Sequence, residues 1–349
     1  IFNLYRIFSI IILKNCQKIM YSFTDKKQKI ALIGCGYWGT IIAKTLTDLK
    51  FKNIIIFDSN ALNAITLQKK FSNLKICEKY SKILNDNTIK NIFFATPPSV
   101  NFKIVKMALN FQKNIFLEKP GVIKKSELKQ LGNLSVKNKC KLMIGYVYCY
   151  NDYVKYIKKI LNRKLLGTVL YINLQRQNLG PIRNDVSVAD DLSSHDLSII
   201  LFLFKKIPLV IKHIKYSILK KNIFDISNLH MKLNKIYIDI NNSWLSPIKV
   251  RTLCIIGSKK MLLFNEMDIN EPIKIYDKYA RYPKIEDFDK KFFNAKALIH
   301  HGKNISPKIK AKPALVNEIK HFLNSGINKN RPITDFKFSF EILKLLKRI

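Results

Sequence analysis

Cysteine is scarce in this sequence, and its spacing does not suggest a metal site. Only six cysteines occur among 349 residues, none in a C-x-x-C pair and none spaced with histidine as zinc ligands are. This excludes the common zinc modules, and we expect no metal. A reduced, cytoplasmic compartment follows most simply from such cysteine usage. Apolar runs of membrane-spanning length are also missing, so we expect no membrane partner.

Acidic residues are few as well, with 24 Asp and Glu against 62 Lys and Arg and a net charge of +38. Such a balance normally points to nucleic acid or to an anionic membrane. The lysines, however, are scattered through the chain among many isoleucines and asparagines instead of forming one basic arm or helix. We attribute the charge to compositional drift and expect no nucleic-acid partner. A basic surface would still attract an anionic nucleotide substrate.

Glycine is limited to 11 residues, yet three of them form the motif G-x-G-x-x-G at 34–39. An apolar run at 30–33 leads into the motif, a helical pattern follows it, and a second apolar run at 54–57 ends on Asp58. The order strand, glycine turn, helix, strand is the context in which this motif binds a dinucleotide. The alternative is a glycine turn without a ligand.

Each glycine of the motif has a physical task in a dinucleotide-binding fold. Gly34 makes the tight turn, Gly36 lets the backbone approach a pyrophosphate, and Gly39 lets the helix pack closely. The helix N-terminus then offers free N–H groups and a positive dipole to the phosphates. Asp58 lies about 20 residues further on, where a carboxylate accepts hydrogen bonds from a ribose diol and repels a 2′-phosphate. The pattern therefore favours NAD over NADP.

The length predicts two domains behind an N-terminal extension. We interpret residues 1–27 as that extension, non-native before Met20, with a membrane anchor or signal peptide as the alternative for 1–19. Residues 28–146 alternate strands with helices, which predicts a Rossmann domain with a doubly wound parallel sheet. Ligands of such sheets bind beyond the carboxyl ends of the strands.

Residues 147–349 show a different pattern. A helix at 152–162 is followed by strand after strand with short polar turns, which predicts an α+β domain with a large, mainly antiparallel open sheet. We expect residues 277–312 to be irregular, and helices at 314–324 and 336–348. The ending at residue 349 suggests that a few C-terminal residues are missing.

Several motifs in order resemble the Gfo/Idh/MocA oxidoreductases, the family of glucose-fructose oxidoreductase and inositol dehydrogenase. They are GCGYWG, ATPPSVNF, LEKP and RQNLGPIRNDVSVADDLSSHDLSIILFL. Within the family, R-x-NLG-x-x-R, SWLSPIKVR, GSKKMLLF, PIKIYDK and NEIKHFL…RPITDF look like the branch that oxidises UDP-linked N-acetylamino sugars at C3. The resemblance implies an NAD-dependent dehydrogenase of a sugar or nucleotide sugar, serving surface-polysaccharide synthesis, and a homodimer or homotetramer associated through the antiparallel sheet.

Two residues are the predicted catalytic groups. Lys119 matches the family's E-K-P motif, whose lysine lies beside the nicotinamide, and an ammonium there stabilises negative charge on the reacting oxygen. His195 matches the family's D-x-x-x-H and opens an apolar helix, where an imidazole can take a hydroxyl proton near neutral pH. Asp191 and His195 fall on one helical face, so Asp191 can orient the imidazole or bind substrate.

The remaining predicted site residues come from the strand ends and from the resembling segments. The predicted cofactor-binding residues are Gly34, Gly36, Tyr37, Trp38, Gly39, Asp58, Thr96, Pro97, Pro98, Glu118 and Lys119. The predicted substrate-binding residues are Tyr146, Arg176, Asn178, Arg183, Asp191 and His195. The planar guanidinium of arginine can donate two parallel hydrogen bonds to diphosphate or carboxylate oxygens. The alternative is that Arg176, Asn178 and Arg183 belong to a surface strand that only forms ion pairs. Tyr37 and Trp38 would pack against the cofactor, or only against the start of the helix.

Three positions depart from the family pattern. Asn101 and Tyr146 stand where many relatives carry histidine, and we expect both changes to be harmless. Asp190 replaces the aromatic residue of close relatives and adds a charge beside Asp191, which leaves the substrate open. The alternatives are a dehydrogenase of a free sugar or inositol, a non-catalytic NAD-binding sensor or interaction protein, and a basic nucleic-acid-binding protein.

Overall fold

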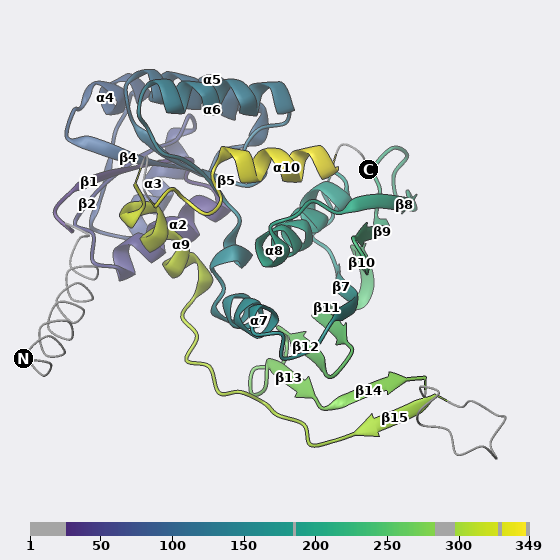
Figure 1. Ribbon diagram of the computed structural model, residues 1–349. Helices are drawn as coiled ribbons and strands as arrows, with labels where there is room; N and C mark the ends of the chain where they lie inside the picture. The colour runs from purple at the N-terminus through teal and green to yellow at the C-terminus, as the bar shows by residue number, and fades with distance from the viewer. Residues whose placement is uncertain (1–25, 184–185, 283–296, 327–329, 347–349) are drawn as a thin grey trace, which may run out of the picture. The chain divides into compact units, whose positions relative to one another are not determined.

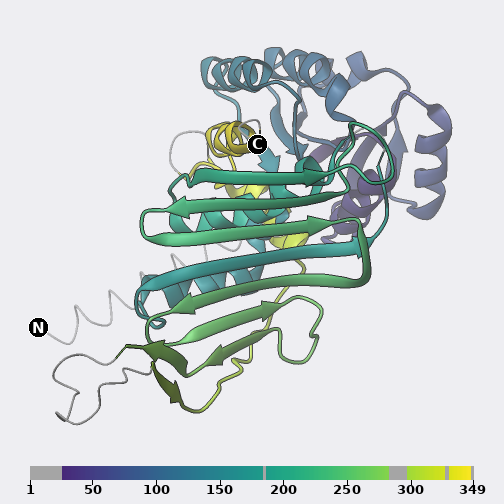
Figure 2. The same ribbon diagram turned by 90° about the vertical axis from the view of Figure 1, so that its right-hand side faces the viewer.

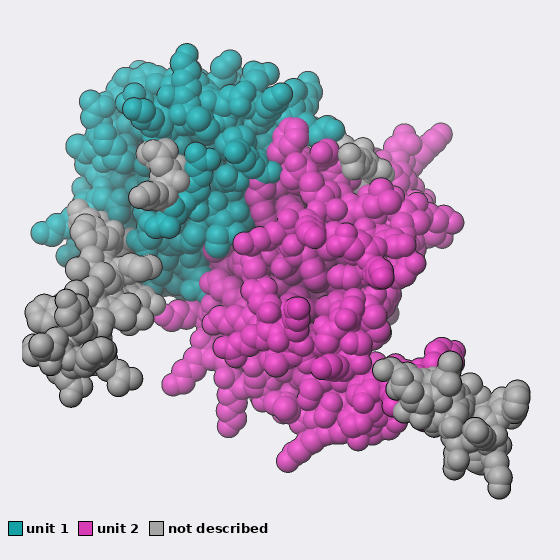
Figure 3. Space-filling view, viewed as in Figure 1, with its two compact units in different colours: residues 1–145, 315–337 teal, residues 146–314, 338–349 magenta. Residues whose placement is uncertain are grey.

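The computed structural model describes residues 26–183, 186–282, 297–326 and 330–346. It divides into two compact units, coloured separately in Figure 3. Unit 1 comprises Ile1–Gly145 and Leu315–Lys337, and unit 2 comprises Tyr146–Ala314 and Phe338–Ile349. The interpretation of residues 1–19 as an extension falls outside the described residues.

Unit 1 is built on a six-stranded parallel sheet with the order β3-β2-β1-β4-β5-β6 (Figure 1). Its strands are β1 (Lys29–Ile33), β2 (Asn53–Phe57), β3 (Leu74–Ile76), β4 (Ile89–Phe94), β5 (Asn114–Glu118) and β6 (Leu142–Gly145). The central strands are apolar and buried because helices cover both faces of such a sheet. The order reverses between β1 and β4, which confirms the predicted doubly wound fold.

The helices of unit 1 cover both faces of this sheet. They are α2 (Tyr37–Asp48), α3 (Ala61–Lys70), α4 (Tyr80–Asn85), α5 (Pro98–Asn110), α6 (Lys125–Lys137) and α9 (Ala314–Asn324). Helices α5 and α6 lie side by side on one face, and α2 lies on the other (Figure 1).

Helix α9 is distant in sequence from the rest of unit 1. Its Phe322 ring lies 5.2 Å from Phe93 of β4 and 5.8 Å from Phe116 of β5, between ring centroids. The sequence predicted this helix with its observed bounds but assigned it to the second domain. Aromatic packing on β4 and β5 is the reason that residues 315–337 belong to unit 1 instead.

Unit 2 contains a seven-stranded sheet with the order β13-β12-β11-β7-β10-β9-β8, seen face-on in Figure 2. Its strands are β7 (Val169–Leu179), β8 (Leu209–Tyr216), β9 (Ile226–Leu233), β10 (Ile236–Ser243), β11 (Leu245–Gly257), β12 (Met261–Asn265) and β13 (Ile273–Tyr276). Strands β7 and β10 pair in parallel and the other neighbours are antiparallel, which confirms the mainly antiparallel sheet.

Helices cover one face of this second sheet (Figure 2). The helical segments of unit 2 are η1 (Val147–Tyr150), α7 (Asp152–Asn162), the π-helical turn η2 (Ala189–Ser193), α8 (Ser194–Phe204) and α10 (Phe336–Leu346), which begins at the end of unit 1. Side chains alternate between the covered and the open face along β9 and β10, as the pleat requires. None of the described helices is both long and apolar enough to cross a membrane.

A short ladder corrects the prediction for residues 277–312. Strands β14 (Lys278–Arg281) and β15 (Leu298–His301) pair antiparallel within the stretch that we expected to be irregular. Each strand has only four residues, too few for a period-two pattern to stand out from the sequence. Residues 283–296 lie outside the described part of the chain.

Candidate active site

The glycine turn joins β1 to α2 at the point where the strand order of unit 1 reverses. Gly34 adopts a positive φ of 94°, and a Cβ there would come within 2.6 Å of the Ala95 carbonyl oxygen at the end of β4. A Cβ on Gly39 would come within 2.0 Å of the Gly34 carbonyl oxygen. Only glycine fits either position, because both approaches are to backbone atoms. At Gly36, by contrast, a Cβ would meet no atom of the described residues within 4 Å.

Asp58, which follows β2, holds this turn in place. Its Oδ2 accepts a hydrogen bond of 2.7 Å from the Cys35 N–H, and its Oδ1 accepts one of 2.8 Å from the Asn60 N–H. Burial, and then the charge of Asp58, raise the pKa of the Cys35 thiol to about 12, so the thiol is neutral at pH 7. The carboxylate therefore has a structural role as well as lone pairs for a ribose diol.

A cavity of about 460 Å³ opens beside the turn. It is lined by Cys35, Gly36, Tyr37, Thr40, Ile41, Asn63, Thr66, Leu67 and Lys70. Gly36 caps α2 without a side-chain hydrogen bond, which leaves the first N–H groups of the helix to a ligand or to water. Tyr37 is 79% exposed, and the neighbouring Trp38 ring meets it edge-on at 6.0 Å. These features fit the phosphates and adenosine of a dinucleotide.

A second turn, formed by Thr96, Pro97 and Pro98, follows β4 and starts α5. Asn101, one turn into this helix, is fully buried and accepts a hydrogen bond from the Thr96 hydroxyl. Its amide donates 2.7 Å to the carbonyl oxygen of Gly121, just beyond the E-K-P motif. The residue that we expected to be a harmless substitution thus ties together two loops at the carboxyl ends of β4 and β5.

Glu118 ends β5 and is followed by Lys119, which is partly exposed, and by a cis peptide bond to Pro120. Burial of the Glu118 carboxyl group raises its pKa to about 7, although the charge of Lys119 acts to lower it. The predicted cofactor residues of unit 1 therefore lie at the ends of β1, β2, β4 and β5, the edge at which open parallel sheets bind ligands.

In unit 2, His195 is the second residue of α8. The π-helical turn η2 places Asp191 before it, in a turn wider than the regular helix from which we predicted a shared face. Asp191 lies 3.6 Å from Arg183, measured from carboxylate oxygen to guanidinium nitrogen. The Tyr148 ring meets the His195 imidazole edge-on with centroids 5.2 Å apart.

Arg176, predicted to bind substrate, is buried inside unit 2. Its Nε and Nη2 donate to Oδ1 of Asp196 at 3.1 and 2.9 Å, and its Nη1 donates 2.7 Å to the Tyr148 hydroxyl. Burial alone would lower the pKa of this guanidinium, but the charge and hydrogen bonds of Asp196, together with Tyr148 and Glu266, outweigh it and the pKa is raised. Asn242 donates 2.8 Å to Oδ2 of Asp196, and Tyr148 donates 2.8 Å to Glu266. Each charged group of this network has a partner.

Two further predicted substrate residues have partners within unit 2. The Tyr146 side chain is fully buried, and its hydroxyl lies 3.2 Å from the Ser339 hydroxyl. Asn178 donates to the Gly180 carbonyl oxygen and accepts from Arg251. Only Arg183, of the two predicted arginines, keeps a substantially exposed side chain, at 39%.

The sequence reasoning missed the network that supports His195. Its members besides Arg176 are Tyr148, Asp196, Asn242 and Glu266. Asp196 was visible as the residue after His195. No spacing pattern marks Tyr148 among the 15 tyrosines of the chain.

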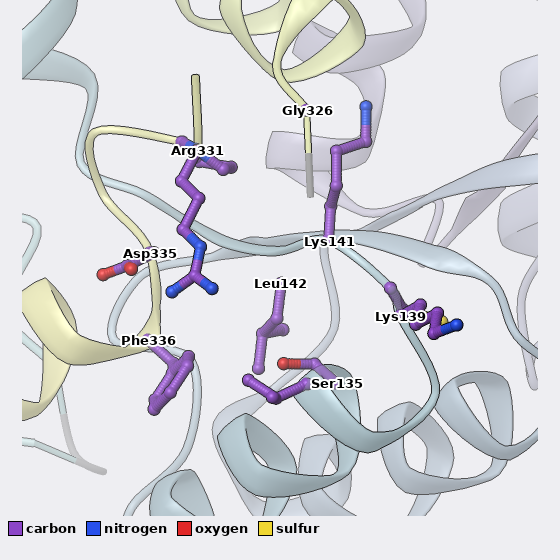
Figure 4. Close-up of a pocket in the computed structure, with 11 residues that line it drawn as sticks. Ser135, Lys139, Lys141, Leu142, Gly326, Arg331, Asp335 and Phe336 are labelled. Atoms are coloured by element: carbon purple, nitrogen blue, oxygen red, sulfur yellow. The ribbon is translucent and has the colours of Figure 1, made fainter. Parts of the chain in front are cut away.

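A separate small cavity of about 50 Å³ lies at the start of β6 (Figure 4). It contains none of the predicted site residues. Lys141, one of its lining residues, donates its Nζ at 2.7 Å to the carbonyl oxygen of Phe322 and at 3.1 Å to that of Ser325. These bonds stabilise the C-terminal end of α9.

The first part of the chain matches a known protein family. Residues 28–146 match the model of the Gfo/Idh/MocA family, described as an oxidoreductase family with an NAD-binding Rossmann fold. The chain is 24% identical over 173 residues to glucose-6-phosphate 3-dehydrogenase of Bacillus subtilis, which is 49% of each protein. The chain spans between two fifths and half of the length of the curated relatives that it matches first.

Solved structures share the fold over nearly the whole chain. UDP-N-acetylglucosamine 3-dehydrogenase GnnA from Acidithiobacillus ferrooxidans has a TM-score of 0.74 at 18% identity, covering 92% of this chain and 96% of its own. GenD2 from gentamicin A biosynthesis, in complex with NAD, has a TM-score of 0.72 at 15% identity, covering 92% of both chains. At this identity the likeness shows the fold.

Proposed function

Residues 28–146 belong to the Gfo/Idh/MocA oxidoreductases, and from this premise we propose that the protein is an NAD-dependent dehydrogenase of a nucleotide-linked amino sugar, oxidising a ring hydroxyl at C3. The observation that carries the proposal is the glycine cradle of Gly34 and Gly39 at the strand reversal, with an uncapped helix N-terminus and a cavity of about 460 Å³ beside it.

The choice of NAD over NADP rests on Asp58. Its carboxylate follows β2, where it would accept hydrogen bonds from a ribose diol and repel a 2′-phosphate. Among the described residues within the cavity lining, Lys70 is the one cationic side chain. The neighbour GenD2, in complex with NAD, has the same fold.

The chemistry requires a hydride and a proton to leave the same alcohol. NAD, when bound, supplies the hydride acceptor. In this proposal His195 takes the hydroxyl proton, and the Lys119 ammonium stabilises the negative charge that develops on the oxygen. Asp191 and Arg183 contribute to substrate binding, and the Arg176 network holds His195 and Tyr148 in place.

Two lines support a sugar substrate oxidised at C3. The motif R-x-NLG-x-x-R at 176–183 and the later SWLSPIKVR, GSKKMLLF, PIKIYDK and NEIKHFL…RPITDF resemble the branch that acts on UDP-linked amino sugars. A curated relative and a structural neighbour are both sugar 3-dehydrogenases, one of glucose 6-phosphate and one of UDP-N-acetylglucosamine. We place the reaction in the cytoplasm, in surface-polysaccharide synthesis, and propose a homodimer or homotetramer associated through the open face of the seven-stranded sheet.

The test is absorbance at the NADH band with the purified protein, NAD and a panel of substrates. The panel comprises UDP-N-acetylglucosamine, its uronic acid, glucose 6-phosphate, glucose and inositol. We expect turnover with the UDP-sugars only, and a loss of kcat on the order of 10²-fold or more in Lys119→Ala and in His195→Ala. Lys125→Ala, at the start of α6, is the matched lysine control.

Each of the other possible results favours one of the alternative functions. Turnover with glucose 6-phosphate, glucose or inositol rejects the nucleotide-sugar substrate and retains the family chemistry. NAD binding that survives Lys119→Ala, with no turnover of any sugar, favours the non-catalytic sensor. Binding that falls steeply with salt, to nucleic acid instead of NAD, favours the nucleic-acid-binding alternative.

A further inference from the structure

Helix α9 carries a carboxyl group that is fully buried in unit 1. Glu318 has no exposed surface, and neither of its carboxyl oxygens has a hydrogen-bond partner among the described residues. A buried ionised carboxylate without partners is costly enough that such a group normally takes up a proton. Glu318 therefore requires a physical explanation.

The packing of α9 on β5 brings Glu318 to Glu118. Phe322 of α9 packs on Phe116 of β5. Two residues further along a strand is about 6.6 Å, and four residues back along a helix is about 6 Å. Glu118 therefore lies on the same face of β5 as Phe116, and Glu318 lies on the same face of α9 as Phe322, each about 6 Å from the aromatic contact. The charge of Glu118 acts on Glu318, in agreement with this placement.

The strand beside β5 leaves room for this arrangement. Glu118 stands opposite Gly145 in the parallel pairing of β5 with β6. A Cβ on Gly145 would come within 3.2 Å of the Glu118 carboxyl oxygen Oε2. The Glu118 carboxyl group therefore lies over β6 within unit 1.

The charge of Glu118 acts on Glu318, and the charge of Lys119 acts on Glu118. Lys141 is committed to the carbonyl oxygens at the other end of α9. Burial, and then the charge of Glu118, raise the pKa of Glu318 well above its ordinary value. Two carboxyls in one apolar site do not both ionise, so the pair keeps at least one proton at pH 7.

We propose that Glu118 and Glu318 form a proton-sharing carboxyl pair, in which neutral Glu318 donates its O–H to Glu118, and that this pair positions Lys119. One proton then leaves a single negative charge on Glu118, directly before the lysine. That charge attracts the Lys119 ammonium and holds the turn after β5. Glu318 is a positioning residue, and this second part rests on the proposed function.

Infrared spectroscopy of the folded protein tests the pair without any substrate. At pH 9, above the pKa of about 7 of Glu118, we expect a protonated-carboxyl band in the wild type, its loss in Glu318→Gln, and no change in Glu78→Gln. Glu78 is the matched control because its side chain is 82% exposed. A wild type without the band, or a band that persists in Glu318→Gln, overturns the pair.

The positioning role has its own readouts. NAD affinity and kcat, each measured across pH, should show an inflection near pH 7 in the wild type, where Glu118 titrates, and Glu318→Gln should shift this inflection, because Glu118 loses the O–H that Glu318 donates. Profiles unmoved by Glu318→Gln, with the infrared band lost, would retain the pair and overturn its link to Lys119. If no sugar is oxidised at all, the proposed function fails, while the infrared band and the NAD profile still decide this inference.

Discussion

The guanidinium of Arg176 is buried, and its hydrogen-bond partners lie within unit 2. Both Asp196 and the Tyr148 hydroxyl bind it, and its side chain is 6% exposed. Asp196 directly follows His195, so the ion pair fixes the start of α8. Arg183 differs because its side chain is 39% exposed, with the Asp191 carboxylate 3.6 Å away. Burial thus separates a structural arginine from a candidate substrate ligand.

We predict that Arg176→Ala and Arg183→Ala fail in different ways. Arg176→Ala leaves the Asp196 carboxylate buried without its cation and should lower the free energy of unfolding by about 3–5 kcal/mol. Arg183→Ala should leave the melting temperature unchanged and raise KM for a UDP-sugar about tenfold, because it removes a charged hydrogen-bond donor. Thermal melts and steady-state kinetics measure both effects. An unchanged KM in Arg183→Ala would argue for a free sugar or inositol as substrate.

The sequence could not predict which of the candidate functional residues are buried. Arg176 stands in a strand motif that resembles a substrate segment, and the same alternation is compatible with a core ion pair. Glu318 lies in an amphipathic helical pattern, where a carboxylate is ordinarily solvated. Its burial follows from tertiary packing of α9, which no local pattern in residues 314–324 records.

At the scale of the element, the β1–α2 turn combines two glycines with different physical reasons. Gly39 is required by the fold itself, since a Cβ would come within 2.0 Å of the Gly34 carbonyl oxygen. Gly36 has a negative φ of −73° and open space around a Cβ. The fold therefore tolerates a side chain at Gly36, and in our proposal the need for glycine there comes from the pyrophosphate of NAD.

We predict that alanine at these two positions separates folding from NAD binding. Gly39→Ala should lower both the melting temperature and the NAD affinity, because the start of α2 must move away from β1. Gly36→Ala should leave the melting temperature without NAD unchanged and weaken NAD binding about tenfold or more, because the methyl group occupies the approach to the pyrophosphate. Calorimetry and NADH fluorescence measure the two quantities. Full NAD affinity in Gly36→Ala would place the pyrophosphate elsewhere.

The bounds of an element were predictable where a strong hydrophobic periodicity ended at a clear capping residue. Helix α7 begins after Asn151, whose side chain accepts from the Tyr153 and Val154 N–H groups, and its predicted bounds are the observed ones. Strands β13, β14 and β15, with four residues each, lacked enough alternation to be identified. The π-helical turn before His195 was also beyond prediction, because Asp191 and His195 fit an ordinary helix equally well.

At the scale of the whole molecule, the chain leaves unit 1 after Gly145 and returns to it at Leu315. The return places Phe322, with no exposed surface, against two phenylalanines of the Rossmann sheet. It also places Glu318 in the same unit as the E-K-P turn. Unit 1 is therefore completed by residues far beyond the segment that carries its glycine motif.

This dependence yields a prediction that compares one core phenylalanine in each unit. Phe322→Ala removes an aromatic ring from the core of unit 1 and should cost about 3–5 kcal/mol of its stability. Phe264→Ala does the same in unit 2, where Phe264 stacks on Tyr153 at 5.7 Å. Because NAD binds unit 1 in our proposal, NAD should raise the melting transition lowered by Phe322→Ala and leave the one lowered by Phe264→Ala unchanged. Calorimetry with and without NAD measures both transitions.

Equal protection of both variants by NAD would show that the two units unfold as one, whereas protection of Phe264→Ala alone would place the NAD site in unit 2.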